Sequence, residues 1–344
     1  MAVRRRLCRV SKHPLQPLAD RHGRVATDLR VSLIDRCNLR CTYCMPAEGL
    51  DWLPNEDVLT DDEVVRLIRI GVEHLGITAV RFTGGEPLLR KGLVDVVRRT
   101  KRLRPSPEVS LTTNALGLGR VAAALRDAGL DRVNVSLDTV RRADFERITL
   151  RDRFDDVIAG LEAARAAGLE PVKVNAVLLR GINDDQAPEL LRWCLDHGYH
   201  LRFIEQMPLD PQHGWMRSTM VTADEILASL QQEFVLSEAR EPRGSQPAEE
   251  FLVDGGPFTV GVIASVTRPF CGDCDRVRLT ADGQIRNCLF ARDESDLRGA
   301  LRAGADDAEI ARRWVAAMAT KLPGHGIDDP AFLQPTRPMS AIGG

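Results

Sequence analysis

Three cysteines stand within one short segment of the sequence, Cys37-Asn-Leu-Arg-Cys41-Thr-Tyr-Cys44. A segment this tight cannot present several bridgeable pairs of thiols, because a disulfide requires a particular separation and direction of its two side chains. Thiolates are instead good ligands for zinc or for an iron–sulfur cluster. A closed tetrahedral site needs four protein ligands. Three cysteines therefore leave one position open for a non-protein ligand, or form a zinc knuckle whose fourth ligand lies elsewhere.

A second set of three thiols lies near the end of the chain, at Cys271, Cys274 and Cys288. A C-x-x-C pair by itself also fits a zinc ribbon or redox chemistry. Cys194 could supply a fourth ligand, but its helical setting favours a buried packing role. The remaining cysteine, Cys8, stands alone. The second set is thus a further candidate metal or cluster site.

Two arginines and a glycine pair accompany these thiols. Arg276 and Arg278 stand at alternate positions of an extended segment, so both guanidiniums project from one face and could bind a polyphosphate bidentately. A solvated surface strand is the alternative. In Gly84-Gly85-Glu86-Pro87 the glycines allow the backbone to approach a ligand closely, and Glu86 offers an acceptor for an ammonium group.

Composition excludes several classes of protein. The 344 residues are 44% hydrophobic and 28% charged, with a formal net charge of −2, which gives no case for binding nucleic acid or an acidic membrane. No apolar run reaches the ~18 residues of a membrane span. Clustered thiols in a long chain without a secretory signal indicate a reducing compartment, so we expect a cytoplasmic protein. Residues 1–25 are basic and are expected to form a flexible extension.

The elements that must position these residues alternate between strand and helix. We predict strands near residues 28–35, 79–82, 108–112, 132–137, 172–178 and 201–204. Between them we predict helices near residues 60–76, 92–103, 120–128, 154–167 and 184–197. Thr60 and Glu63 form a capping box at the first helix. Six such units predict an α/β fold, an incomplete (β/α)6 TIM-like barrel with an open side and with ligands at the carboxyl ends of its strands.

A change in composition near residues 238–250 marks a boundary. We expect a partial barrel over residues 26–240 and a C-terminal α+β extension over residues 241–344 that closes the open side. The extension should contain short strands near 251–253 and 261–266, a hairpin near 281–283 and a helix near 306–318. The last residues end in Gly343-Gly344, and their composition is typical of a mobile tail.

The first cysteine motif, with Tyr43 as its aromatic residue, resembles the signature of the radical S-adenosylmethionine (SAM) superfamily. In that superfamily the fourth iron of a [4Fe–4S] cluster is left for SAM. From about residue 28 onward the chain resembles the GTP 3′,8-cyclases of molybdopterin biosynthesis, the MoaA family (molybdenum cofactor biosynthesis protein A). The matching segments are CNLRCTYC, RFTGGEP, LTTN, NVSLD, KVN, RFIEQM, CGDCDRVR and the closing glycine pair. Ala115 departs from the family, which usually has glycine there, and the basic extension lies outside the resemblance.

The resemblance implies roles for sixteen residues. Two [4Fe–4S] clusters would be held by Cys37, Cys41 and Cys44 and by Cys271, Cys274 and Cys288. SAM would lie against Tyr43, Gly85, Ser136 and Met207. GTP would be contacted by Arg30, Arg81, Thr112, Lys173, Arg276 and Arg278. Arg202 is a further candidate for GTP, and the family is understood to insert its glycine pair into the active site.

The resemblance implies a lyase that converts GTP to 3′,8-cyclo-7,8-dihydroguanosine 5′-triphosphate, the first step of molybdenum cofactor biosynthesis. The expected partners are a flavodoxin- or ferredoxin-like electron donor and the cyclic pyranopterin monophosphate synthase that takes the product, with a homodimer as the assembly to test. Two alternatives remain open at this point. One is a radical SAM peptide-modifying enzyme with an auxiliary cluster, although such enzymes usually carry more C-terminal cysteines. The other is an electron-transfer or zinc-binding module without catalysis.

Overall fold

The computed structural model describes residues 17–239 and 243–343. Residues 1–16, which include Cys8 and most of the expected extension, lie outside the described residues, as do residues 240–242 and Gly344. Within the described ranges no helix is both long and apolar enough to cross a membrane.

The predicted alternation of strands and helices is confirmed. The six strands are β1 (Asp28–Ser32), β2 (Ala79–Thr83), β3 (Glu108–Thr113), β4 (Arg132–Ser136), β5 (Lys173–Val177) and β6 (His200–Ile204). The helices between them are α1 (Asp61–His74), α2 (Leu93–Lys101), α3 (Ala122–Ala128), α5 (Phe154–Ala166) and α6 (Ala187–His197). The capping box of Thr60 and Glu63 is present at the start of α1, where each residue accepts a backbone hydrogen bond from the other.

Sequence patterns missed four helices: α4 (Arg142–Thr149) and α7 (Ala223–Leu230), and near the end of the chain the short helices α8 (Arg298–Arg302) and α10 (Met339–Ile342). Helix α4 is short and has no side-chain cap, so its pattern is weak. Helix α7 does carry a signal, because Thr222 and Glu225 form a second capping box. The described 3-10 turns are η1 (Pro87–Leu89), η2 (Leu118–Arg120), η3 (Arg217–Thr219) and η4 (Cys271–Asp273).

All described strands belong to one sheet, in the order β12-β11-β10-β1-β2-β3-β4-β5-β6-β9-β8-β7. The C-terminal strands are β7 (Leu236–Glu238), β8 (Glu249–Val253), β9 (Thr259–Ile263), β10 (Arg276–Leu279), β11 (Gln284–Arg286) and β12 (Ser295–Asp296). Strand β10 pairs in parallel with β1, and β9 pairs in parallel with β6. The outer pairs are antiparallel, and the sheet does not close into a barrel.

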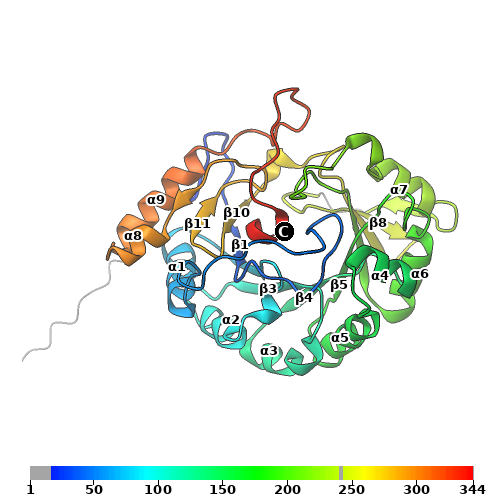
Figure 1. Cartoon of the computed structure of the whole chain (residues 1–344), viewed down its shortest axis with the longest axis horizontal. Helices are drawn as coiled ribbons and strands as arrows, with labels where there is room; N and C mark the ends of the chain where they lie inside the picture. Colours follow the sequence, from blue (N-terminus) through cyan, green and yellow to red (C-terminus); the bar gives the residue numbers. More distant parts are fainter. Residues whose placement is uncertain (1–16, 240–242, 344) are drawn as a thin grey trace, which may run out of the picture.

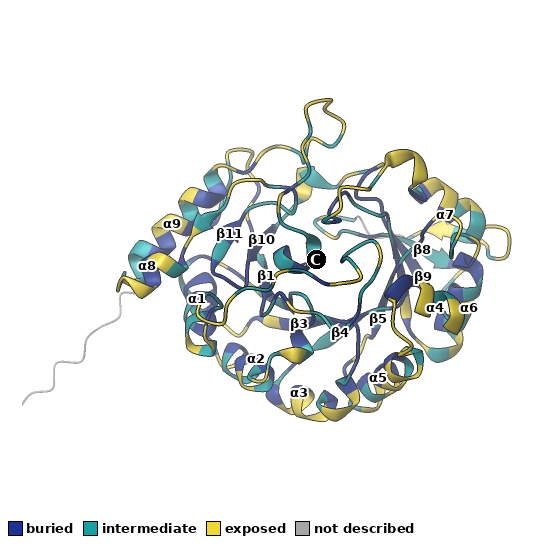
Figure 2. Ribbon diagram, in the orientation of Figure 1, coloured by how far each residue is buried: buried dark blue, intermediate teal, exposed yellow. Residues whose placement is uncertain are grey.

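The expected incomplete barrel is therefore confirmed, and the C-terminal region continues the same sheet. Its strands lengthen both free edges of the barrel sheet, while helices α8 (Arg298–Arg302) and α9 (Asp307–Ala319) pack outside (Figure 1). The helices form an outer ring with exposed outer faces, and the strands they cover are largely buried (Figure 2). Apolar side chains between these two layers make the main core.

The end of the chain turns back into the ring of strands. The short helix α10 (Met339–Ile342) lies at the centre of the view in Figure 1, and Ile342 is fully buried. The composition of this segment suggested a mobile tail, but burial of its apolar side chains beside Leu209 and Phe290 holds it in place as far as Gly343.

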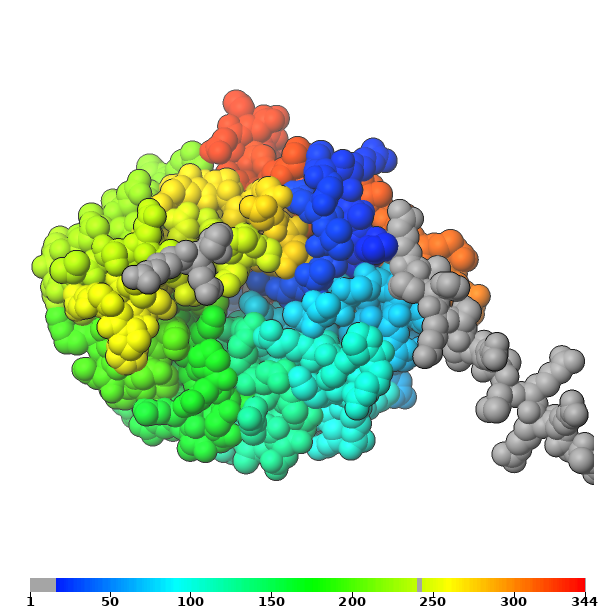
Figure 3. All heavy atoms as spheres, turned by 180° about the vertical axis from the view of Figure 1, so that it is seen from behind, coloured from blue at the N-terminus to red at the C-terminus, as the bar shows by residue number. Residues whose placement is uncertain are grey.

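Residues 17–25 also pack against the C-terminal region. Leu18 is fully buried, and the buried guanidinium of Arg24 donates to the carbonyls of Cys271, Leu322 and Pro323. Figure 3 shows this N-terminal segment beside parts of the C-terminal region. The segment we had included in the flexible extension thus supports the loop of the second thiol set.

Candidate active site

One cavity of about 320 Å³ lies at the carboxyl ends of the parallel strands. It brings together fifteen of the sixteen site residues that the sequence indicated. These are Cys37, Cys41, Tyr43, Cys44, Gly85, Ser136, Met207, Cys271, Cys274, Cys288, Arg30, Arg81, Thr112, Arg276 and Arg278. The exception is Lys173. The cavity follows from the topology, because parallel strands direct the loops at their carboxyl ends to the same side of the sheet.

The two glycines after β2 anchor the first cysteine loop. The Gly85 amide donates to the carbonyl of Ile34 over 2.7 Å, and the Glu86 amide donates to that of Arg36 over 2.7 Å. A Cβ atom added at Gly85 would lie 2.2 Å from the Arg36 carbonyl oxygen. We expected these glycines to allow a ligand to approach; the close approach that requires them here is to the chain's own backbone.

Glu86 is fully enclosed between these loops. Its carboxylate accepts from the Thr113 hydroxyl and the Asn114 amide, both over 2.7 Å, and from the Leu88 amide over 2.9 Å. Burial raises the pKa of Glu86 to about 7, although these hydrogen bonds oppose the rise. The acceptor we had assigned to an ammonium group is thus engaged in joining the ends of β2 and β3.

The side chain of Asn114 reaches the first cysteine loop itself. Its amide nitrogen donates to the Asn38 side chain over 2.7 Å and to the Cys37 sulfur over 3.7 Å. The adjacent Ala115 has a φ of +65°, in the left-handed region where glycine is favoured. The family's usual glycine at this position therefore has a backbone reason, and Ala115 tolerates the same turn at a cost of about 1 kcal/mol.

Tyr43 and Asp138 connect the cysteine loop to β4. The Tyr43 hydroxyl donates to the Asp138 carboxylate over 3.0 Å, and the second oxygen of Asp138 accepts from the Val177 amide over 2.9 Å. Burial raises the pKa of Asp138 to about 6. Asp138 lines the cavity but was not among the predicted site residues. Two features of the sequence could have identified Asp138 as a site residue. It follows β4 directly, and it lies inside the segment NVSLD that carries the family resemblance.

The first three thiols lie near one another in a poorly solvated environment. Burial, followed by the charges of Asp138 and the other two cysteines, raises the pKa of Cys41 well above its usual value. Burial and the charge of Cys37 raise the pKa of Cys44 to about 12. Such thiols hold their protons unless a metal centre displaces them. Three thiolates beside an open cavity suit a four-iron cluster with one iron free for another ligand.

The second three thiols lie at another part of the same cavity, in a more cationic environment. Burial raises the pKa of Cys274, but the charges of Arg276 and then Lys321 outweigh it and lower the pKa to about 7. The backbone carbonyl of Cys271 accepts a hydrogen bond from Arg24, which holds the loop around this cysteine. Cys194 is buried in the helix–sheet core and does not line the cavity, as expected. No group of three or more His, Cys, Asp or Glu side chains in the described ranges is arranged around a single metal ion.

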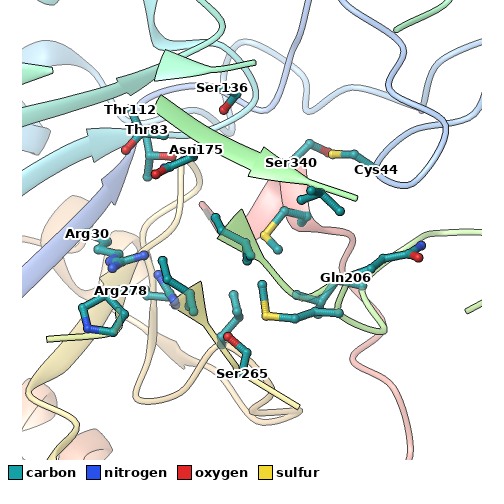
Figure 4. Close-up of a pocket in the computed structure, with 18 of the residues that line it drawn as sticks. Arg30, Cys44, Thr83, Thr112, Ser136, Asn175, Gln206, Ser265, Arg278 and Ser340 are labelled. Atoms are coloured by element: carbon teal, nitrogen blue, oxygen red, sulfur yellow. The ribbon is translucent and has the colours of Figure 1, made fainter. Parts of the chain in front are cut away.

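Three arginines form a row across the floor of the cavity. Arg30 is the register partner of Arg278 on β10 and of Arg81 on β2, so the three side chains stand on neighbouring strands. Figure 4 shows Arg30 and Arg278 side by side. Asp28 approaches the row most closely, at 4.0 Å from Arg30 and 3.9 Å from Arg81. We refer to Arg30, Arg81 and Arg278 as the arginine row.

The arginine row has little negative charge beside it, although Arg278 is buried and Arg30 and Arg81 are only slightly exposed. Burial lowers the pKa of Arg278 to about 10, and burial together with neighbouring arginines lowers those of Arg30 and Arg81. The Nε atom of Arg30 and the Nη2 atom of Arg276 have no hydrogen-bond partner in the described part of the chain. Arginine stays protonated at neutral pH even with such shifts. The floor of the cavity is therefore suited to an anion.

Lys173 and Arg202 lie on the same inner surface of the sheet. Lys173 precedes the cavity-lining Asn175 by two residues on β5 and does not line the cavity itself. Burial and the charge of Arg202 lower the pKa of Lys173 to about 8. Arg202 lines the cavity and donates to the side chains of Asn134 and Asn175. Both Lys173 and Arg202 were predicted from the sequence as site residues, whereas Asn175 was included only as part of the segment KVN.

The C-terminal tail reaches this floor. The Gly343 carbonyl accepts from Arg278 over 2.9 Å, and Ser340 lines the cavity near Cys44 (Figure 4). Gly343 has a φ of +81°, and a Cβ atom there would lie 2.3 Å from the Ser32 hydroxyl oxygen. Only glycine fits this position. The second glycine, Gly344, is outside the described residues.

Both parts of the chain match families of known proteins. Residues 31–194 match the family model of the radical SAM superfamily, and residues 199–327 match the model described as Molybdenum Cofactor Synthesis C. The GTP 3′,8-cyclase of Streptomyces coelicolor is 66% identical over 97% of this chain and 98% of its own length. The GTP 3′,8-cyclase of Mycolicibacterium smegmatis is 63% identical over 95% of this chain and 92% of its own length.

Solved structures share the fold at low sequence identity. A crystal structure of Streptococcus suis SuiB matches with a TM-score of 0.56 and 14% identity, over 83% of this chain and 67% of that chain. SuiB bound to S-adenosylmethionine matches with a TM-score of 0.54 and 14% identity, over 80% of this chain and 65% of that chain. This chain thus spans about two-thirds of the length of SuiB, and the likeness concerns the fold alone.

Proposed function

The chain belongs to the GTP 3′,8-cyclase family of radical SAM enzymes, and from this premise we propose which residues hold its cofactors and its substrate. It is a SAM-dependent lyase that cyclises GTP to 3′,8-cyclo-7,8-dihydroguanosine 5′-triphosphate in molybdenum cofactor synthesis. The peptide-modifying and zinc-binding alternatives are set aside, because relatives with this activity match nearly the whole chain.

We propose that each three-thiol set holds one [4Fe–4S] cluster, with Cys37, Cys41 and Cys44 beside SAM and Cys271, Cys274 and Cys288 beside GTP. The observation that carries this assignment is that both sets and the arginine row line one cavity. Three thiolates per set agree with a cluster that leaves one iron for SAM or for the purine.

For the substrate, we propose that the arginine row and Arg276 bind the triphosphate of GTP. The unpartnered guanidinium atoms of Arg30 and Arg276 support this role, since each arginine fork can donate two hydrogen bonds to phosphate oxygens. Thr112 also lines the cavity and would contact the nucleoside, and Lys173 would contribute its positive charge from farther along the inner face of β5. A substrate without charge would leave these cations unpaired.

For the cofactor, we propose that Tyr43, Gly85, Ser136 and Met207 lie against SAM, because all four line the cavity that the first thiol set also lines. When bound, SAM and the first cluster supply the radical that takes hydrogen from carbon 3′ of the ribose. The chain's own residues set the geometry: Glu86 joins the loops after β2 and β3, and Tyr43 ties the cysteine loop to Asp138. Enclosure by α10 and Gly343 limits the access of water.

We further propose partners that the comparisons leave open. The first cluster requires one-electron reduction, which a flavodoxin- or ferredoxin-like donor would supply, and the product would pass to the cyclic pyranopterin monophosphate synthase. Clustered thiols that serve as ligands must stay reduced, which supports a cytoplasmic location. A homodimer is the assembly we propose to test by light scattering.

The test of the site assignment is anaerobic incubation of reconstituted enzyme with SAM, GTP and a reductant, followed by mass analysis of the nucleotide. We expect about eight irons per chain in the wild type. Cys37→Ala, Cys41→Ala or Cys44→Ala should abolish cleavage of SAM, whereas Cys271→Ala, Cys274→Ala or Cys288→Ala should remove only the second cluster's iron. Cys194→Ala is the matched control and should keep all the iron. Stoichiometric zinc without iron would refute the assignment.

A further inference from the structure

Lys321 is a buried lysine in direct contact with the second thiol set. It follows α9 and is only 4% exposed. Its ammonium donates to the carbonyls of Cys274 and Arg276 over 3.1 and 3.0 Å and to the Cys274 sulfur over 3.4 Å. These three contacts use all three hydrogens of the ammonium group. No sequence signal pointed to this residue, since a lysine after a helix usually has no role beyond the helix terminus.

The ammonium has no carboxylate partner. Among the described residues, no Asp or Glu lies within ion-pair distance of Lys321, in contrast to Lys101, whose ammonium is 2.6 Å from Asp131. Burying a cation is unfavourable unless an anion or several acceptors compensate it. The group in contact with Lys321 that can carry a full negative charge is the thiolate of Cys274. The cation is therefore paired with a cluster ligand.

We propose that Lys321 is a positioning residue that raises the reduction potential of the second cluster through its charge and its hydrogen bond to Cys274. This inference rests on the proposed function, because it takes Cys274 as a cluster ligand. Hydrogen bonds to cluster sulfurs and the local net charge are the main protein influences on such potentials. A positive charge stabilises the reduced cluster, which carries one more electron, so it moves the potential in the positive direction.

The other contacts of Lys321 join this thiol to the substrate-binding strand. The carbonyls that it binds belong to Cys274 and Arg276, at the start of β10, the strand that carries Arg278 into the arginine row. Arg24 donates to the next two carbonyls, those of Leu322 and Pro323, so the backbone directly after Lys321 is also held in place. One buried ammonium thus holds both the proposed cluster ligand Cys274 and the start of β10 in place through hydrogen bonds.

The experiment measures the potential of the second cluster alone. Full-length enzyme carrying Cys37→Ala, Cys41→Ala and Cys44→Ala is reconstituted anaerobically, so that its electron paramagnetic resonance signal comes from the second cluster. Redox titrations then compare Lys321 with Lys321→Met, which removes the charge at similar length, and Lys321→Arg, which keeps it. Lys101→Met in the same background is the control, because that ammonium is paired with Asp131 outside the cavity.

We expect Lys321→Met to shift the midpoint potential in the negative direction, Lys321→Arg to recover most of the shift, and Lys101→Met to leave the potential unchanged. An unchanged potential in Lys321→Met with four irons bound overturns the inference. Where Lys321→Met and Lys321→Gln both lose the cluster, retention by Lys321→Arg supports a requirement for the charge, and loss by Lys321→Arg as well overturns it. Absence of iron from the background protein itself instead refutes the second cluster in the proposed function.

Discussion

Buried cations on the cavity floor are the feature at the residue scale that bears most directly on substrate choice. Arg30, Arg81 and Arg278 occupy neighbouring register positions, and Asp28 approaches two of them at about 4 Å. Burial lowers the pKa values of Arg30 and Arg81, and repulsion from Arg81 and Arg278 lowers that of Arg30 further. A triphosphate relieves that repulsion, so the number of phosphates should govern affinity.

The first prediction concerns Arg81. Arg81→Met should weaken GTP binding about tenfold or more, because a charge-assisted contact contributes roughly 1.5–3 kcal/mol. Isothermal titration calorimetry under anaerobic conditions measures the change. Arg132→Met is the matched control: Arg132 also lies on the sheet, but its charge is paired with Glu108 over 2.6 Å and it does not line the cavity. Equal affinities of the wild type for GMP and GTP would contradict the role of the arginine row.

The second prediction concerns the pH dependence of stability. The native pKa of Glu86 is about 7, above its usual 4.5, so between these values the native protein holds a proton that the unfolded chain releases. The stability that this proton provides is full below pH 4.5 and is lost as the pH rises through 7. The total corresponds to about 3 kcal/mol at most, since one pKa unit is worth about 1.4 kcal/mol.

Thermal unfolding of the wild type and Glu86→Gln, measured between pH 5 and pH 8, tests this dependence. The melting temperature of the wild type relative to the variant should fall as the pH rises, because the variant has no proton to lose at this position. Glu48→Gln, at an exposed site, serves as the control and should track the wild type. A constant difference between wild type and Glu86→Gln across this range would show that burial does not perturb Glu86.

At the scale of elements, the C-terminal helix α10 and Gly343 complete the cavity from a segment remote in sequence. The tail contacts the arginine row through the Gly343 carbonyl and places Ser340 beside the first thiol set. Its apolar residue Ile342 packs near Leu209 and Phe290, which supplies the burial that holds it there. The tail is therefore a wall of the site.

The third prediction is that Gly343→Ala displaces this wall. The added methyl would lie 2.3 Å from the Ser32 hydroxyl oxygen and 2.8 Å from the Thr83 methyl carbon, and φ is +81°. GTP cyclisation should fall at least tenfold while all the iron is retained, as anaerobic turnover and iron analysis would show. Gly324→Ala is the control, because open space surrounds that position.

Deletion of Gly343-Gly344 should have the same effect as the substitution. A free peptide copy of about the last ten residues should then restore part of the activity, because the cavity that receives the tail would remain intact. Full turnover by the truncated enzyme would mean that the tail is not part of the catalytic site.

At the scale of the whole molecule, the two regions share one sheet. Strands β9 and β10 come from the C-terminal region, yet they pair with β6 and β1 and bury Val260, Val262, Val277 and Leu279. Removing them would expose two strand edges and the apolar surface around them. We propose that residues 26–240 and 241–344 form one folding unit in spite of the change in composition between them.

The fourth prediction follows from this shared sheet. A fragment ending at residue 240 should aggregate or lack a cooperative thermal transition, and its iron content should fall below the four irons of one cluster. Size-exclusion chromatography, calorimetry and iron analysis measure these properties. Deletion of residues 1–16, with the rest of the chain intact, is the matched control and should behave as the full-length protein. A monodisperse fragment with a stable cluster would show that the partial barrel folds alone.

The sequence by itself determined the local elements and the chemistry of the ligands. Hydrophobic periodicity and capping at Thr60 predict strands β1 to β6 and the helices α1, α2, α3, α5 and α6 between them, because those signals act over a few residues. The short strands β7 and β12 carry no such signal. The spacing of Cys37, Cys41 and Cys44 sets a ligand number that no later contact changes. Fifteen of the sixteen predicted site residues line one cavity, since parallel topology gathers the ends of strands.

Only the tertiary structure decided which distant segments meet. The pairing of Asp28 with Arg276, the contact of Lys321 with Cys274 and the insertion of Gly343 beside Arg278 join residues that no local pattern connects. Such contacts depend on the burial and pairing of whole elements, so they carry no periodic signal in the sequence. The sequence therefore determined the candidate ligands and the strands of the barrel, whereas the fold decided their electrostatic environment and the walls that enclose them.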